Sequence, residues 1–214
     1  MNSLDVEAAV GRAVSSRRLL THPYYRAWVA GSLTMGDLGA YAGQYRHVEQ
    51  CLPQVLSATV ERLDDEIARH LVEANLADEL SRPRPHLDLF DAFAAAVGAG
   101  GAAPTTATAH LVSVYQEAAA TGPVAALAVI GAYEVQAAEV ATTKARSLRA
   151  LYGLDAAATE FWDVHAEMED AHAAWTTDAL RALDASPAVV AEFAGRSGDA
   201  WWAFLDDRDG ARLV

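Results

Sequence analysis

Residues 165–172 read His-Ala-Glu-Met-Glu-Asp-Ala-His, and this stretch decides how the rest of the chain is interpreted. On an α-helix, offsets of three, four and seven residues place His165, Glu169 and His172 on one face. Two imidazoles and a carboxylate on one face suit iron, manganese or zinc. The Glu-x-x-His spacing is also the one that helical bundles use for di-iron carboxylate centres. The stretch therefore predicts a helical bundle with a metal site, and a solvent-facing acidic stripe is the alternative interpretation.

Three further side chains with metal-binding chemistry lie in segments that the sequence predicts to be buried. Glu79 lies in a mostly apolar helix, His86 follows it across a Pro-rich turn, and Glu134 comes directly after the apolar run 126–133. A buried carboxylate is costly unless it is paired, hydrogen-bonded or bound to metal, so a hydrogen-bonded structural Glu is the alternative for each. Together with the three residues of 165–172, they supply three carboxylates and three imidazoles. That set suits two divalent ions with open positions for dioxygen.

The rest of the chain shows helical periodicity and no convincing strand alternation. A Thr34-x-x-Asp37 cap is expected to open a long helix that Pro53 should kink or break. Gly153 is expected to be the C-terminal cap of the helix 123–152. The residues after 205 are expected to be flexible or to pack against a partner. The prediction is one all-α domain over residues 1–214, a bundle of about seven to eight helices. Its expected segments are 4–19, a start at 22–23, the helix from 34 onward, 64–81, the turn 82–85, 86–97, 105–120, 123–152, 156–183 and 187–205.

Composition bounds the class of protein and its partners. The net charge is -13, from 29 acidic and 16 basic residues, which argues against a nucleic-acid partner. Cys51 is the single cysteine, so no disulfide can form within the chain, and a reducing compartment is expected. The first residues have no basic start followed by an apolar run, and no uninterrupted apolar run reaches about 18 residues. We therefore expect a cytoplasmic protein that binds small molecules, has no membrane partner and forms a homodimer.

A resemblance to a known family narrows these possibilities. Its motifs are His22-Pro23-Tyr24-Tyr25 with Trp28, Leu38-x-x-Tyr41-x-x-Gln44-Tyr45, Asn75-Leu76-x-Asp78-Glu79, Tyr133-Glu134-x-Gln136, Lys144-x-x-x-Leu148 and 165–172. They span roughly residues 20–172 and resemble the haem-oxygenase-like di-metal oxidases, which share a thiaminase II-like helical fold. The closest branch is that of the chlamydial protein associating with death domains and its bacterial relatives. That branch is linked to making p-aminobenzoate for folate.

The resemblance implies a ligand set and two reacting residues. Two iron ions, or one iron and one manganese, are implied to be held at Glu79, His86, Glu134, His165, Glu169 and His172. The chlamydial protein has Asp at the fifth of these positions, and the longer Glu here bears on the spacing of the metals. The branch also implies that Tyr25 supplies the aromatic ring of the product and that Lys144 donates the amine. Dioxygen and an external reductant are the implied co-substrates.

Elementary helix geometry sets a condition on Lys144. It follows Glu134 by ten residues, which on a straight helix means about 15 Å along the axis and roughly 80° in azimuth. Lys144 therefore reaches the metals only if the helix bends or bulges between the two residues. The alternative for Lys144 is a surface lysine that pairs with Glu139 or Asp163. The alternative for Tyr25 is ordinary packing between helices.

Three functions follow from these observations. The first is a di-iron or iron–manganese oxidase that consumes its own Tyr25 and Lys144 to make p-aminobenzoate and reacts once per chain. The second is a di-iron oxidase that acts on an external amino acid, amine or fatty acid and has a substrate-sized pocket beside the metals. The third is a non-enzymatic interaction module with a vestigial metal site. Thiaminase-like relatives use a cysteine nucleophile, but Cys51 is expected to be a buried, small apolar residue.

Overall fold

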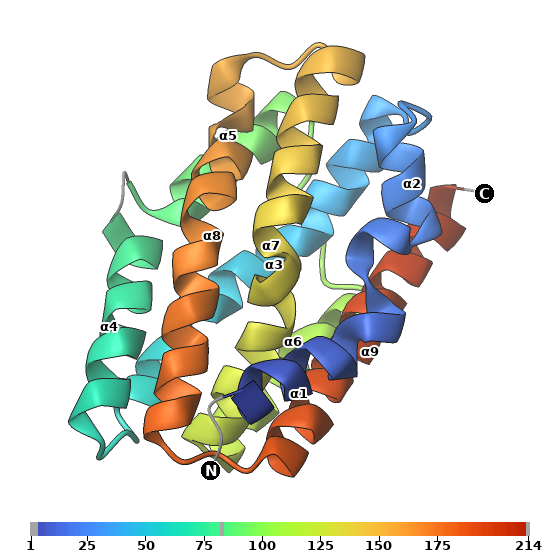
Figure 1. The fold of residues 1–214 in the computed structure, drawn as a ribbon. Helices are drawn as coiled ribbons and strands as arrows, with labels where there is room; N and C mark the ends of the chain where they lie inside the picture. Colours follow the sequence, from blue (N-terminus) through green and yellow to red (C-terminus); the bar gives the residue numbers. More distant parts are fainter. Residues whose placement is uncertain (1–3, 82–83, 213–214) are drawn as a thin grey trace.

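The computed structural model describes residues 4–81 and 84–212. Within these ranges the chain is all-helical and has no strand (Figure 1), which confirms the expected fold class. The described residues form nine α-helices, and two 3₁₀ turns, Ser15–Arg17 and Leu19–Thr21, connect the first two of them. The helices are α1 (Leu4–Val14), α2 (Pro23–Val29), α3 (Met35–Val60), α4 (Glu66–Ser81), α5 (His86–Ala96), α6 (Thr106–Thr121), α7 (Pro123–Tyr152), α8 (Ala156–Ala182) and α9 (Pro187–Arg212).

The helix boundaries differ from the expected ones in three places. The first helix ends at Val14, because the chain continues through the two 3₁₀ turns rather than as α-helix. A kink or a break was expected at Pro53; Pro53 lies inside α3, which continues to Val60, so the helix is not broken there. The residues after 205 extend α9 as far as Arg212 instead of forming a separate tail. Arg82 and Pro83 of the expected turn lie outside the described residues.

Local signals in the sequence account for several helix ends. Thr34 and Asp37 form the expected capping box, with Asp37 N–H donating to Thr34 Oγ1 at 3.1 Å and Thr34 N–H donating to Asp37 Oδ2 at 2.7 Å. Gly153 ends α7 in the left-handed conformation at φ 70°, as expected of a cap glycine. Gly31 has a φ of 67° and separates α2 from α3. The nine α-helices of the described residues exceed the expected seven to eight.

Helix α7 forms the centre of the bundle. It packs most extensively on α8 and next on α9, and α4 and α5 cover other parts of α8 (Figure 1). A Cβ placed on Gly131 would lie 3.2 Å from Thr176 Cγ2, so this glycine allows α7 to approach α8 closely. By length and composition α7 could cross a membrane, but 72% of its most apolar 18-residue stretch is buried inside the structure. Burial in the bundle therefore accounts for its apolar character.

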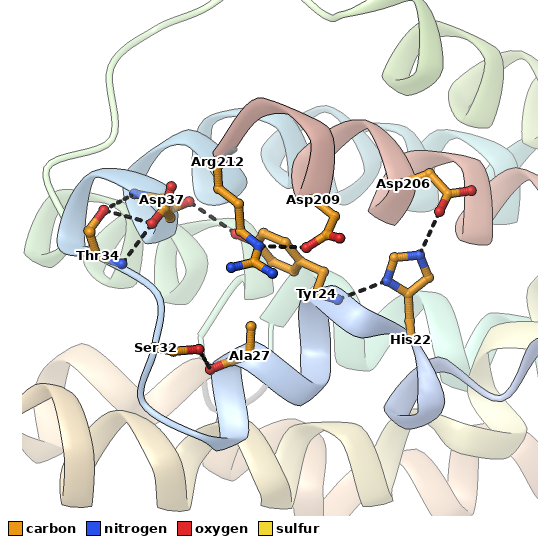
Figure 2. A network of polar contacts seen from close by, with 9 residues as sticks. All are labelled: His22, Tyr24, Ala27, Ser32, Thr34, Asp37, Asp206, Asp209 and Arg212. Carbon is orange, nitrogen blue, oxygen red and sulfur yellow. Dashed lines mark hydrogen bonds and ion pairs between the residues drawn. The ribbon is translucent and has the colours of Figure 1, made fainter. Parts of the chain in front are cut away.

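Polar contacts fix the N-terminal end of the short helix α2 (Figure 2). His22 caps it, since the Tyr24 N–H donates to His22 Nδ1 at 3.1 Å. His22 Nε2 must then carry the proton, and it lies 3.0 Å from Asp206 Oδ1 of α9. The Tyr24 hydroxyl donates to the carbonyl of Asp37 at 3.1 Å, at the start of α3. These contacts hold Tyr25, which points into the interior and is 1% exposed.

Candidate metal centre

Four helices contribute the six side chains that the sequence singles out as metal ligands. Glu79 lies near the end of α4, His86 is the first residue of α5, and Glu134 lies in the middle of α7. The remaining three come from one face of α8, as their spacing predicts. All six side chains are between 1% and 7% exposed. The solvent-facing acidic stripe considered for α8 is therefore wrong for these three residues.

The six side chains form two adjoining triads. In the first triad, ligand atoms of Glu79, His86 and His165 lie within 4.8 Å of one another. The second triad, Glu134, Glu169 and His172, meets the same criterion of 4.8 Å. His172 Nδ1 lies 3.9 Å from Glu79 Oε1 and 3.9 Å from Glu169 Oε2, so it connects the two triads. The structure thus brings the six predicted residues together, and metal binding by them stays a prediction.

The imidazole of His165 is oriented for coordination. Its Nδ1 lies 2.8 Å from the carbonyl oxygen of Phe161, to which it donates, so Nε2 keeps its lone pair. That Nε2 faces the triads and lies 3.9 Å from Glu169 Oε1. Burial, followed by the charge of His86, lowers the pKa of His165 to about 3, which keeps the ring neutral. A histidine that binds metal is usually neutral, and the ring nitrogen that faces away from the metal usually donates a hydrogen bond, for example to a backbone carbonyl.

The carboxylates of the second triad lack enough partners within the described protein. Asn75 Nδ2 donates to Glu134 Oε1 at 2.8 Å, but Glu134 Oε2 and Glu169 Oε2 are buried without a hydrogen bond. Burial raises the pKa of Glu134, and burial together with the charges of Glu134 and Glu79 raises that of Glu169 well above its usual range. A cation between the triads would relieve this repulsion and give the orphaned oxygens a partner. The donor set therefore fits two divalent metal ions.

The pKa of Glu79 is shifted in the opposite direction from those of Glu134 and Glu169. Burial raises its pKa, but the close contact with His86 and the charge of that imidazole outweigh burial, and the net pKa is lowered. His86 Nδ1 lies 2.9 Å from Glu79 Oε2. Glu79 is therefore ionised, which is the form that binds metal.

A small cavity lies between the triads. Its lining includes all of the second triad, Glu79 and His165. It also includes four polar residues that were not predicted to belong to the metal site: Tyr45, Glu49, Tyr115 and Tyr133. The cavity has a volume of about 20 Å³, which is enough for a water-sized molecule. Pockets for organic ligands are typically about 300–1,000 Å³. An oxidase of external substrates was expected to have a substrate-sized pocket beside the metals, and this cavity is too small to be that pocket.

Lys144 lies in an aromatic cage rather than among the metal-facing residues. Its Nζ donates to the Tyr41 hydroxyl at 2.6 Å, and the Tyr41 hydroxyl lies 2.8 Å from that of Tyr25. The faces of five aromatic rings lie 4.0 to 5.2 Å from Nζ; they belong to Tyr25, Trp28, Tyr41, Tyr45 and Trp162. Lys144 is 1% exposed, and burial lowers its pKa well below the usual value.

Two interpretations of Lys144 are thereby settled. It is not a surface lysine, because Glu139 pairs with Arg18 and Asp163 pairs with Arg149. The helix α7 stays α-helical from Pro123 to Tyr152, so no bulge turns Lys144 toward the triads. The difference in azimuth between Glu134 and Lys144 instead directs the lysine to Tyr25.

A chain of tyrosines connects the aromatic cage with the cavity. The rings of Tyr41 and Tyr45 stack with centroids 5.4 Å apart, and the Tyr45 hydroxyl lies 2.7 Å from that of Tyr133. Tyr45 and Tyr133 both line the cavity. These tyrosines belong to the motifs of the family resemblance, which implies no role for them. The signal was present, since Tyr41, Tyr45 and Glu49 recur every four residues and so share one face of α3.

Cys51 has no part in this site. It is buried, and burial raises the pKa of its thiol to about 11. A thiol with a raised pKa is a poor nucleophile at neutral pH. The result agrees with the expected role of a small apolar residue.

Comparison with known proteins places these features in a family. A family model described as iron-containing redox enzyme matches residues 39–201. A protein named 4-aminobenzoate synthase from Nitrosomonas europaea is 34% identical, over 92% of this chain and 88% of that protein. A second protein of that name, from Chlamydia pneumoniae, is 27% identical over 91% of this chain and 90% of that protein.

Solved structures show the same fold. A CADD-like protein from Nostoc punctiforme superposes with a TM-score of 0.79 over 99% of both chains, at 13% sequence identity. A domain with a heme oxygenase-like fold from Shewanella denitrificans has a TM-score of 0.78, covers 100% of this chain and 94% of its own, and is 16% identical. The haem-oxygenase-like bundle is therefore confirmed.

Proposed function

Because this chain belongs to the iron-containing redox enzyme family, we propose that it makes p-aminobenzoate from its own Tyr25 ring and the side-chain nitrogen of Lys144. The name 4-aminobenzoate synthase, which two relatives carry, denotes formation of the same compound. In this proposal the chain is its own substrate, so each chain reacts once. The carbon–nitrogen bond would form at the ring carbon that loses the phenolic oxygen. The Nζ–Cε bond of Lys144 and the Cα–Cβ bond of Tyr25 would break, and the Tyr25 Cβ would be oxidised to the carboxyl carbon of the product. Dioxygen would be the oxidant for these steps, and an external reductant would supply the remaining electrons.

The two triads would hold the metal. Iron ions there, or one iron and one manganese, would supply redox chemistry with dioxygen. The protein keeps His165 neutral through the carbonyl of Phe161 and orients Glu134 through Asn75. The six side chains are at most 7% exposed, so bulk solvent is largely kept from the site.

The observation that carries the proposal is the enclosure of Tyr25 with Lys144. The two side chains share the Tyr41 hydroxyl, and the amine faces the Tyr25 ring at 4.5 Å from its centroid. Burial favours the neutral amine, whose lone pair is the nucleophile needed to form a carbon–nitrogen bond. An amine held in place against the ring has a large advantage over a free amine in solution.

The tyrosine chain supports a role for Tyr25 at a distance from the metal cavity. Tyr133 and Tyr45 line the cavity, and Tyr41 links Tyr45 to Tyr25 through ring stacking and a hydroxyl contact. We assign to this chain the transfer of an electron from Tyr25 toward the cavity. The hydroxyl contact between Tyr25 and Tyr41 provides a path for the phenolic proton.

The test uses isotopes in the protein itself. The chain is produced with ring-labelled tyrosine and, separately, with lysine labelled at its side-chain nitrogen, then loaded with iron(II) without oxygen. After dioxygen and a reductant are added, p-aminobenzoate released from the protein is analysed by mass spectrometry. We expect the product to carry the ring label in one sample and the nitrogen label in the other. Unlabelled product in both samples would sink the self-consuming reaction.

A further inference from the structure

The two metal triads differ in charge. The triad of Glu79, His86 and His165 has one carboxylate, whereas the triad of Glu134, Glu169 and His172 has two. A divalent ion in each would be neutralised in the second triad but would leave one positive charge uncompensated in the first. Unbalanced charge in a buried site is costly, because the protein interior solvates it poorly. A further carboxylate beside the first triad would remove this cost.

Glu49 of α3 has the position that this charge balance requires. It is 7% exposed and lines the same cavity as Glu79 and His165. The charges of Glu79 and His86, two members of the first triad, act on the carboxyl group of Glu49. Neither triad includes Glu49, and it comes from a helix that contributes none of the six ligands.

The backbone of α3 is loosened beside Glu49. In an α-helix the N–H of residue i bonds to the carbonyl of residue i−4, and Pro53 has no N–H. The carbonyl of Glu49 therefore lacks its helical partner, although α3 continues through Pro53. A helix with one ladder bond missing at this point can adjust locally, and the Glu49 side chain can move with it.

We propose that Glu49 is an additional metal ligand that completes the first triad. Each ion then has two carboxylates, and the four carboxylates balance two divalent ions. The inference rests on the proposed metal centre and adds a ligand from a fifth helix to it. It also gives α3 a direct connection between the metals and the tyrosine chain, because Tyr45 lies one helical turn before Glu49.

The test measures metal content rather than activity. Purified wild type, Glu49→Gln and the control Glu73→Gln are titrated with iron(II) under anaerobic conditions, desalted and analysed for iron per chain. Glu73 is an exposed residue of α4, the helix that carries Glu79, so the control makes the same chemical change without touching the cavity. We expect Glu49→Gln to lose one of the two ions, with at least about tenfold weaker binding at that site. Wild type and Glu73→Gln should both retain two.

Two further variants guard against a folding defect. Glu49→Asp keeps the carboxylate and should bind the second ion with intermediate affinity, while Glu49→Ala should behave as Glu49→Gln does. Circular dichroism of the metal-free proteins should be the same for all of them. If folded Glu49→Gln binds two ions with wild-type affinity, the proposal is overturned and the metal centre stands. If the wild type itself binds no iron, the proposed function fails and this ligand fails with it.

Discussion

The side-chain nitrogen of Lys144 lies 4.5 Å from the centroid of the Tyr25 ring, although α2 and α7 carry these residues more than a hundred positions apart. Both residues are 1% exposed, and the hydroxyl of Tyr41 contacts both side chains. An external amine would have to displace packed aromatic rings to reach the same position. This arrangement therefore gives the Tyr25 ring a built-in nitrogen donor.

Tyr41 is expected to hold the reacting pair together. The change Tyr41→Phe removes the hydroxyl that accepts from Lys144 Nζ and leaves the Tyr25 hydroxyl without this partner. We expect the free energy of unfolding to fall by about 1–3 kcal/mol, because buried polar groups lose their hydrogen bonds. The yield of p-aminobenzoate should fall sharply while iron content stays at the wild-type level. Chemical denaturation, product assay and metal analysis measure the three quantities.

Tyr24→Phe is the matched control for this variant. The Tyr24 hydroxyl donates to the carbonyl of Asp37 (Figure 2), whereas the hydroxyl that accepts from Lys144 Nζ belongs to Tyr41. It should lose a comparable hydrogen bond but keep most of the product yield. Equal yields from Tyr41→Phe and wild type would contradict the role assigned to Tyr41.

Lys144 is expected to destabilise the fold that contains it. Burial of an amine that is charged in the unfolded chain is costly, so Lys144→Met should raise the free energy of unfolding by about 1 kcal/mol or more. The same variant should form no p-aminobenzoate. Arg146→Met, an exposed change two residues away, should alter stability by less than about 0.5 kcal/mol. A Lys144→Met protein that is markedly less stable than wild type would show that the cage holds a stabilising ammonium group instead.

The pH dependence of stability tests the charge state of Lys144. Burial lowers the pKa of Lys144 below the 10.5 of the unfolded chain, so between the lowered pKa and 10.5 the unfolded state binds more protons. Wild-type stability must therefore rise with pH in that window relative to Lys144→Met, by up to about 1.4 kcal/mol per pH unit. Denaturation curves of both proteins at several alkaline pH values give this difference. A constant difference across the window would show that the pKa of Lys144 is not lowered.

Much of the fold follows from local signals in the sequence. The capping box at Thr34, the cap glycine Gly153 and the proline that opens α7 each define a helix end through their own chemistry. The end of α1 was not predicted, and Pro53, where a kink or a break was expected, does not end α3. They depend on packing against other helices, which can outweigh a local preference.

The sequence predicted the six candidate metal ligands better than it predicted the surroundings of Lys144. The α8 residues follow from helical spacing, and the other three ligands from apolar context together with the family resemblance. The geometry of one helix could not place Lys144, since its neighbours come from α2, α3 and α8. Glu49 was missed because one carboxylate on a long helix carries no signal until the fold places it beside the triads.

The carboxylate of Glu169 should destabilise the metal-free protein and stabilise the metal-bound protein. Because burial and the charges of Glu134 and Glu79 raise the pKa of Glu169, Glu169→Gln should stabilise the metal-free protein by about 1 kcal/mol. Manganese(II) at about 100 times its dissociation constant should stabilise wild type by about 2.7 kcal/mol, and this gain should be much smaller in Glu169→Gln. Thermal unfolding with manganese(II) or with a chelator measures both effects.

The exposed neighbour provides the control for that experiment. Glu167→Gln should match wild type in both conditions, because its side chain faces solvent. If manganese(II) stabilised Glu169→Gln as much as wild type, the second triad would not be a metal site.

The central claim, that the protein is consumed by its own reaction, is tested most directly by peptide mass mapping after the reaction. Iron-loaded protein is exposed to dioxygen and reductant, and the product is quantified against the peptides that contain Tyr25 and Lys144. We expect the amount of p-aminobenzoate never to exceed the amount of chain, with both peptides altered in proportion to it. Product in excess of the chain, with both peptides intact, would contradict the account.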